Sequence, residues 1–173
     1  MTDNNELKGL GGWLILVGVG VVLSPIRLLV IYIPYYKSIF EDGRWEAFTT
    51  VGSEAYIPYF GAMLIGEITF NSIMVVVLIY LIFLFFSKHH LFPKIFIGIF
   101  VASIIFIFLD ALLVTMVFPD ESIFDPKTTI ALMQALIGCL IWVPYMLVSK
   151  RVRATFVGKL HNKKMQPTAE SVG

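Results

Sequence analysis

The segment "IPYFGAMLIGEITFNSIMVVVLIYLIFLFF" (residues 57–86) decides the fold, because it is an unbroken apolar run with one charged side chain, Glu67. A helix needs about 20 such residues to cross a bilayer. Three more apolar blocks of comparable length occupy about 12–36, 93–118 and 128–148. The chain is 58% hydrophobic and only 14% charged, whereas soluble domains carry roughly 25% charged residues. This pattern excludes a soluble protein and predicts an all-α, polytopic membrane protein.

The connections between the blocks predict how the four spans are arranged. Short turns make consecutive helices antiparallel neighbours, which favours an up-down four-transmembrane-helix bundle over residues 12–148. Residues 1–11 then form a cytoplasmic N-terminus, and residues 149–173 form a basic cytoplasmic tail. The longest connection contains Trp45 and Phe48, three residues apart, and we expect a short helix there that lies on the membrane.

The distribution of lysine and arginine predicts the orientation of the bundle. With four crossings, nine cations lie on the side of the two termini: Lys8, Lys88, Lys94, Lys150, Arg151, Arg153, Lys159, Lys163 and Lys164. Three lie on the other side: Lys37, Arg44 and Lys127. Cytoplasmic loops of membrane proteins carry the excess of Lys and Arg. We therefore expect both termini in the cytoplasm.

The first block, about residues 12–36, is predicted to be a retained span. It is longer than the 7–15-residue apolar region of a signal peptide, and it contains an arginine, Arg27. No small-residue cleavage pattern follows it.

Five polar residues inside the apolar blocks are the candidate site. Arg27, Glu67 and Asp110 are ionisable, and Asn71 and Gln134 are amides. Counted inward from the predicted outer ends of the spans, four of them lie about 9–13 Å deep at a rise of roughly 1.5 Å per residue. Asn71 lies one helical turn further in, on the same face as Glu67. The sequence therefore predicts an intramembrane polar cluster.

Burial costs predict the pairing within this cluster. A charge at the centre of a span costs roughly 2.5–3.5 kcal/mol, so we expect the charged groups to face the bundle interior. There Arg27 would pair with either Glu67 or Asp110, and the amides would complete the hydrogen bonds. The remaining carboxyl would take up a proton near neutral pH or bind a cation. Alternatively, the cluster only fixes helix register.

The sequence offers no catalytic residues, metal site or cofactor motif. The single cysteine, Cys139, lies inside the fourth span and is expected to be a small buried residue. His89 and His90 are adjacent in a predicted turn, where neighbouring side chains diverge and no third ligand is near.

The tail after the fourth span has an amphipathic pattern. Apolar residues recur every four positions: Val148, Val152, Phe156 and Leu160. The cations that surround them are predicted to bind anionic lipid headgroups of the inner leaflet: Lys150, Arg151, Arg153 and Lys159. An ordinary cluster of positive charge that stops translocation is the alternative. Nucleic-acid binding is not expected, because the aromatic residues that stack on bases are lacking.

Five segments in order resemble one known family: "GLGGWLILVGVGVVLSPIRLL", "GSEAYIPYFGAMLIGEITFN", "FFSKHHLFPK", "FLDALL" and "IWVPYMLVSKRVRATFV". They are similar to the bacterial four-span inner-membrane family catalogued as domain of unknown function 2569. The resemblance covers about Leu10 to Val157, and the family's typical Arg, Glu, Asn and Asp positions fall on Arg27, Glu67, Asn71 and Asp110. It implies a four-span inner-membrane protein and no particular activity.

Two functional hypotheses follow from these observations. The first is a non-enzymatic accessory or assembly protein that binds another membrane protein or a second copy of itself, because four short-looped helices leave little room for a substrate path. The second is a small proton- or cation-linked transporter or channel that uses Glu67 and Asp110. An enzyme is the weakest interpretation, and binding of a lipid or quinone between the helices stays open.

Overall fold

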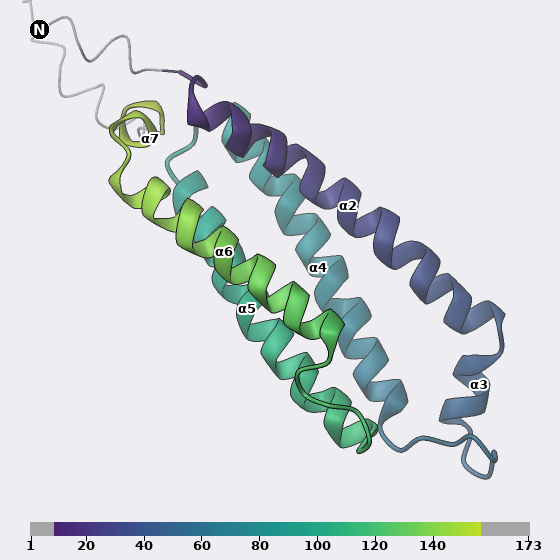
Figure 1. Cartoon of the computed structure of the whole chain (residues 1–173). Helices are drawn as coiled ribbons and strands as arrows, with labels where there is room; N and C mark the ends of the chain where they lie inside the picture. Colours follow the sequence, from purple (N-terminus) through teal and green to yellow (C-terminus); the bar gives the residue numbers. More distant parts are fainter. Residues whose placement is uncertain (1–8, 157–173) are drawn as a thin grey trace, which may run out of the picture.

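The computed structural model describes residues 9–156 and contains four long helices and two short ones (Figure 1). In chain order the helices are α2 (Trp13–Glu41), α3 (Arg44–Thr49), α4 (Phe60–Phe86), α5 (Phe92–Val117), α6 (Pro126–Val148) and α7 (Lys150–Thr155). The four long helices are each apolar and long enough to cross a membrane. The predicted all-α, four-span architecture is confirmed.

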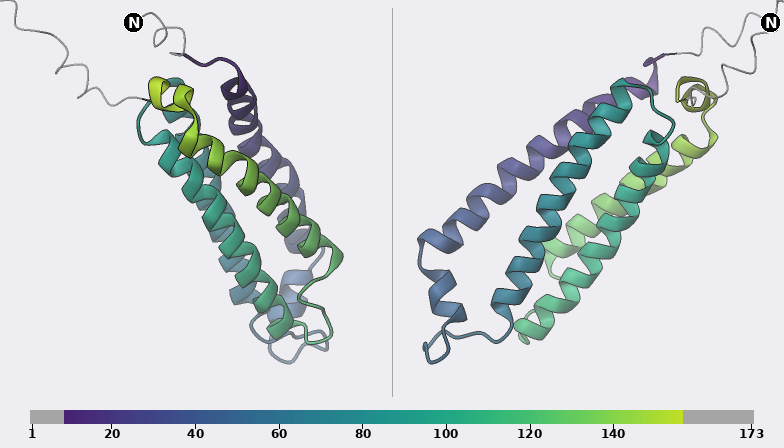
Figure 2. Two further views of the ribbon diagram at one scale, coloured as in Figure 1. Left: turned by 60° about the vertical axis from the view of Figure 1, so that its left-hand side comes forward. Right: turned by 180° about the vertical axis from the view of Figure 1, so that it is seen from behind.

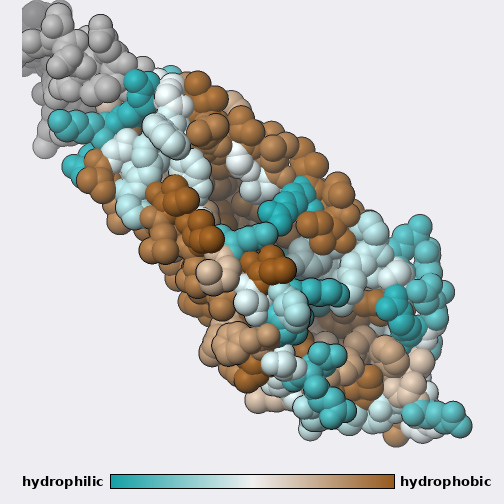
Figure 3. Space-filling view, in the orientation of Figure 1, coloured by the Kyte–Doolittle hydropathy of each residue, from teal (hydrophilic) through white to brown (hydrophobic). Residues whose placement is uncertain are grey.

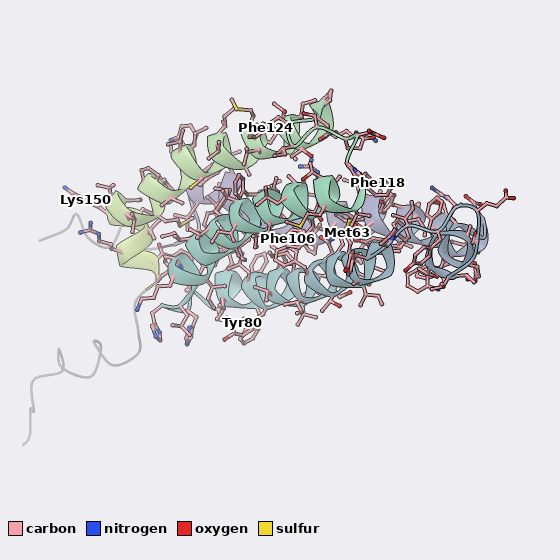
Figure 4. All side chains as sticks on the ribbon, turned by 90° about the horizontal axis from the view of Figure 1, so that it is seen from below. Met63, Tyr80, Phe106, Phe118, Phe124 and Lys150 are labelled. Atoms are coloured by element: carbon pink, nitrogen blue, oxygen red, sulfur yellow. The ribbon has the colours of Figure 1, made fainter. Side chains whose placement is uncertain are left out.

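Each long helix packs along the next one in the chain, so α4 and α5 are central and α2 and α6 are the edges. The right-hand view of Figure 2 shows α4 between α2 and α5. Figure 4 shows Phe106 of α5 pointing between α5 and α4, and Tyr80 pointing away from the bundle. The ring of Phe106 stacks on Phe70 of α4 with centroids 3.6 Å apart. The predicted up-down order is therefore present.

Within residues 9–156, α2 and α6 do not pack along one another, so the bundle is open between them. Figure 3 shows a hollow between these two helices, with hydrophilic side chains gathered in its middle. We call this side of the molecule the α2–α6 opening. The sequence pattern predicted four neighbouring helices but did not predict that the first and last would stay apart.

The helix α2 is longer than predicted, which matters for the depth of Arg27. Its predicted end was at residue 36, but the helix continues to Glu41 even though Pro34 lies within it. Lys37 and Glu41 form an i,i+4 ion pair of 3.5 Å in this extra turn, an arrangement that supports exposed helices. Gly43, with a φ of 70°, then separates α2 from α3. The short helix expected around Trp45 is confirmed as α3.

The start of α6 follows the rules for a helix N-terminus. Asp125 is the N-cap, and its carboxylate accepts hydrogen bonds from the backbone N–H of Lys127 and Thr128. Pro126 occupies the first helical position, where its missing N–H is not needed. The hydrogen bonds from Thr128 are the main reason that the pKa of Asp125 lies below its usual range.

The two ends of the described chain meet at one end of the bundle, here called the α7 end. The hydroxyl of Thr155 and the backbone of Gly9 lie within hydrogen-bond distance, with the Gly9 N–H donating at 3.2 Å. The tail does not continue α6, because Ser149 adopts an extended conformation and caps a separate helix, α7. Val152 and Phe156 are buried against the bundle.

Aromatic rings hold α7 to the α7 end. The ring of Phe92, which is fully buried, lies 5.1 Å from that of Phe85 and 4.5 Å from that of Phe156. These three rings join α4, α5 and the residue that ends α7. The remaining buried residues of this core come mainly from α2 and α4.

Two glycines allow close contacts between helices. A Cβ added to Gly18 would lie 2.7 Å from the ring of Phe85, and one added to Gly138 would lie 2.8 Å from the ring of Phe100. Gly20, two residues from Gly18, has no atom within 4 Å of such a Cβ. Gly18 therefore sets the separation of α2 and α4.

We predict that Gly18→Ala lowers the free energy of unfolding by about 1–3 kcal/mol, the usual cost of overpacking. The added methyl group would lie 2.7 Å from the buried ring of Phe85, so the ring or the helix would have to shift. Gly20→Ala is the matched control and should leave stability unchanged or raise it by up to about 1 kcal/mol, since alanine favours helix. Unfolding in mixed micelles, followed by far-UV circular dichroism, measures both. Equal effects of the two variants would contradict the contact.

Candidate functional site

Arg27 lies at the centre of α2, with fourteen helical residues on either side of it within Trp13–Glu41. Its side chain is exposed in the α2–α6 opening. The guanidinium Nη2 donates to Oε1 of Gln134 on α6 at 3.5 Å, the long limit of a hydrogen bond. This contact is the one hydrogen bond that joins the two edge helices in the part of the chain that the structure describes.

The predicted ion pair between Arg27 and a carboxylate is not formed. Among residues 9–156 the ion pairs are Lys37–Glu41 and Arg44–Asp42. Both lie at the end of the bundle opposite α7, here called the α3 end. The partner of Arg27 is instead a neutral amide, and the arginine is not buried as expected. The prediction of a buried Arg–Glu–Asp cluster joined by an ion pair is therefore wrong in its pairing.

The length of α2 explains this difference. Arg27 lies fourteen residues from the end of α2 at Glu41, whereas Glu67 lies seven residues from the start of α4. At a rise of about 1.5 Å per residue, their positions along the bundle differ by roughly 10 Å. Asp110 and Gln134 lie seven and eight residues from the α3-side ends of α5 and α6. Arg27 is therefore closer to the middle of the bundle than either carboxyl, Glu67 or Asp110.

Glu67 is paired with tyrosine instead. The hydroxyl of Tyr36 on α2 donates to Oε1 of Glu67 at 3.2 Å and accepts from Nδ2 of Asn71 at 2.9 Å. Asn71 Nδ2 also lies 3.1 Å from the backbone oxygen of Glu67. Asn71 is buried and Glu67 is half-buried. Tyr36 therefore connects α2 to α4, and we call these three residues the Tyr36 cluster.

Tyr36 was missed because three tyrosines near the end of a span are typical of the aromatic belt at a membrane surface. The ring of Tyr36 stacks on that of Tyr32, with centroids 5.6 Å apart. One signal in the sequence points to the cluster. Glu67 and Asn71 are one helical turn apart within a span, and a carboxyl and an amide there need a hydrogen-bond partner such as a hydroxyl from a neighbouring helix.

Asp110 has no side-chain hydrogen bond and no ion pair with any residue between Gly9 and Phe156. Its side chain is half-buried on α5. The five predicted residues thus divide into three parts. Arg27 contacts Gln134. Glu67 and Asn71 form hydrogen bonds with Tyr36. Asp110 forms no side-chain hydrogen bond within the described residues.

We predict that Tyr36→Phe lowers the free energy of unfolding by about 1–2 kcal/mol, because it leaves two polar groups without their shared partner. Interhelical hydrogen bonds in membranes average about 0.6 kcal/mol, and Tyr36 makes two. Tyr35→Phe is the control, since Tyr35 is exposed and makes no side-chain hydrogen bond in the described structure. Thermal unfolding in detergent compares the two. A larger loss for Tyr35→Phe would contradict the assignment.

The basic residues at the α7 end occupy different environments. Lys150 and Arg153 are exposed, and the guanidinium of Arg153 donates to the backbone oxygen of Leu147 at 2.9 Å. Arg151 is half-buried against Gly11, whose added Cβ would lie 2.6 Å from Arg151 Nη1. Lys159, the fourth predicted headgroup ligand, lies outside the described residues, as does Leu160.

Metal-ligand residues do not gather in the described part of the chain, where no group of three His, Cys, Asp or Glu could hold an ion. The rings of His89 and His90 lie 4.3 Å apart in the turn between α4 and α5. His89 Nδ1 accepts a hydrogen bond from the backbone N–H of Leu91. Cys139 is partly exposed on α6, not fully buried as expected.

Four apolar helices that are long enough to span a membrane, with a few polar side chains within them, define a multi-pass membrane protein. Residues 7–157 match the family model described as "Protein of unknown function (DUF2569)". The chain belongs to this family, and the resemblance drawn from its sequence segments is confirmed. A comparison with curated proteins and one with solved structures find no match.

Proposed function

We propose that this protein is a non-enzymatic accessory or assembly protein of the bacterial inner membrane. In this proposal, the α2–α6 opening receives a transmembrane helix of another membrane protein, and that helix presents a carboxyl group to Arg27. The observation that carries the proposal is the exposure of Arg27 at the middle of a span, beside a neutral amide.

The cost of an exposed charge supports a partner. An arginine at the centre of a span costs roughly 2.5–3.5 kcal/mol, and a single long hydrogen bond from Gln134 offsets little of it. A carboxylate offers a guanidinium two parallel hydrogen bonds and the opposite charge. The open side of the bundle gives a helix access to Arg27, because α2 and α6 are apart there.

The charge distribution supports the orientation. The termini of the described chain lie together at the α7 end, where Lys88, Lys94, Lys150, Arg151 and Arg153 also lie. We place this end in the cytoplasm, following the rule that Lys and Arg accumulate there. Arg27 would then stand near mid-membrane, accessible to a partner helix in either orientation.

Synthetic helices test the proposal. The full chain, labelled with a donor dye, is reconstituted in liposomes with Leu/Ala-rich transmembrane peptides that carry a central Asp, Asn or Lys and an acceptor dye. We expect energy transfer to the Asp peptide to exceed that to the Asn peptide at least fivefold. Arg27→Gln should reduce the Asp signal to the Asn level, and the Lys peptide should not associate.

Arg44→Gln is the matched control, because Arg44 is an exposed cation at the α3 end. It should leave the preference for the Asp peptide unchanged. Equal transfer to the Asp and Asn peptides would contradict the proposal. Energy transfer between two labelled copies of the protein that disappears in Arg27→Gln would also overturn it, since the occupant would then be a second copy.

A small proton- or cation-linked transporter or channel is the second candidate. It is favoured by Glu67 and Asp110, two half-buried carboxyls of which Asp110 has no partner in the described structure. In this alternative, the carboxyls carry the proton or cation. Proteoliposomes with an internal pH dye test it. Flux that is lost in both Glu67→Gln and Asp110→Asn would favour the transporter over the accessory protein.

A further inference from the structure

We propose that a groove between α2 and α4 at the α7 end binds one acyl chain of an anionic phospholipid, with Arg151 and Lys88 at the phosphate. This site lies on different residues from the α2–α6 opening and does not depend on the proposed function. It also goes beyond a general attraction of the basic tail to the membrane surface, because it places one lipid at one position.

The groove is lined by apolar residues and glycine and has a volume of about 390 Å³. It is lined by residues of both helices and of the segment before α2: Leu10, Ile15, Gly18, Val19, Val22, Leu23, Phe85 and Phe86. The absence of a side chain at Gly18 lets the ring of Phe85 approach α2 closely. Val19 and Leu23 stay about half exposed beside it.

The dimensions of the groove fit one leaflet. From Ile15 to Leu23 it follows α2 for about 12 Å, at a rise of roughly 1.5 Å per residue. The hydrocarbon of one leaflet is about 15 Å thick, half of the roughly 30 Å core. An acyl chain that runs along the groove from the α7 end therefore reaches its inner end near the bilayer midplane.

Two cations belong to the end of the bundle at which the groove opens. Arg151 lies against Gly11, the residue that follows Leu10. Lys88, which is exposed, comes two residues after Phe86. A phosphate at the head of a lipid in the groove would lie between these two cations.

No acidic residue of the described chain competes for the two cations. All of the acids within residues 9–156 lie either at the α3 end or inside the spans: Glu41, Asp42, Glu46, Glu54, Glu67, Asp110, Asp120, Glu121 and Asp125. Because each cation near an anionic membrane surface contributes about a fivefold gain in binding, the site favours an anionic headgroup over a zwitterionic one.

Native mass spectrometry of the full chain in detergent tests the site, with phosphatidylglycerol and phosphatidylcholine of identical acyl chains as probes. We expect the protein to retain phosphatidylglycerol at least fivefold more than phosphatidylcholine. Arg151→Gln should reduce this preference about fivefold. Val22→Trp, which fills the groove, should lose both lipids.

Two control variants leave the site intact. Leu140→Trp places the same new side chain at an exposed position on α6, and Lys127→Gln removes a cation at the other end of the bundle. Both should retain phosphatidylglycerol as the unmodified protein does. If Val22→Trp does not fold, as judged by circular dichroism, Arg151→Gln still decides the proposal.

Three results would overturn the proposal. They are equal retention of the two lipids, an unchanged preference in Arg151→Gln, and full retention by folded Val22→Trp. Inorganic phosphate separates a lipid site from a free-phosphate site. If phosphate without an acyl chain displaced phosphatidylglycerol at equal concentration, the groove would contribute nothing and the lipid assignment would be wrong.

Discussion

Phe92→Ala is expected to lower the free energy of unfolding by about 3 kcal/mol. Truncation of a buried phenylalanine costs roughly 3–5 kcal/mol in soluble cores. The lower figure applies here because burial among lipid-facing helices lacks most of the hydrophobic term. Phe92 is fully buried and its ring touches three others, those of Phe85, Phe96 and Phe156. Its loss would leave a cavity where α4, α5 and the end of α7 meet.

Phe108→Ala is the matched control on the same helix, since Phe108 is 49% exposed. It should change stability by less than about 0.5 kcal/mol. Unfolding in mixed micelles gives both values, and limited proteolysis after Arg153 should show α7 released in Phe92→Ala alone. Similar losses in the two variants would mean that α7 is not held by this aromatic cluster.

Arg27→Leu is expected to improve the insertion of the first span by about 3–4 kcal/mol. Arginine at a helix centre costs roughly 2.5–3.5 kcal/mol on insertion scales, and leucine gains about 0.5 kcal/mol. Arg27 lies at the centre of α2, so the full difference applies. A glycosylation assay of the isolated span in microsomes measures it. Such a gain would show that Arg27 makes the insertion of the first span less favourable.

The control for insertion is Lys37→Leu, near the end of α2, where a long cation reaches the interface. Its effect should be under about 1 kcal/mol, because the cost of a charge falls away from the bilayer centre. If Lys37→Leu improved insertion as much as Arg27→Leu, the span would be positioned differently in the bilayer. Arg27 would then not lie at the middle of the bilayer.

Much of the fold follows from local sequence signals. The four apolar runs exceed the length of a bilayer crossing, and Asp125 followed by Pro126 marks the start of a helix. The end of α2 was placed too early, because the polar segment after Tyr36 reads as a loop in hydropathy alone. The i,i+4 pair of Lys37 and Glu41 extends the helix instead.

The opening between α2 and α6 could not be predicted, because it depends on which faces of the helices meet. Spacing alone does not distinguish Gly18, which touches Phe85, from Gly20, which touches nothing within 4 Å. Small residues are common in membrane helices, so their presence indicates close packing without locating it.

The residue types of the candidate site were predicted better than its pairing. Glu67, Asn71 and Gln134 each contact a residue of α2, as an interior polar cluster requires. The observed partners differ from the predicted ones because α2 ends at Glu41, five residues later than predicted. Arg27 therefore lies five residues deeper in its helix than the sequence analysis assumed. Tyr36 then lies opposite Glu67, and Arg27 faces the α2–α6 opening.

The free energy of unfolding of Arg27→Gln tests the central claim most directly, which is that Arg27 faces the α2–α6 opening without a carboxylate partner in its own chain. The account predicts a change of less than about 0.5 kcal/mol in the purified protein, as for an exposed residue. A loss of about 3–5 kcal/mol, the cost of breaking a buried ion pair, that is restored by Glu67→Gln or Asp110→Asn would contradict it.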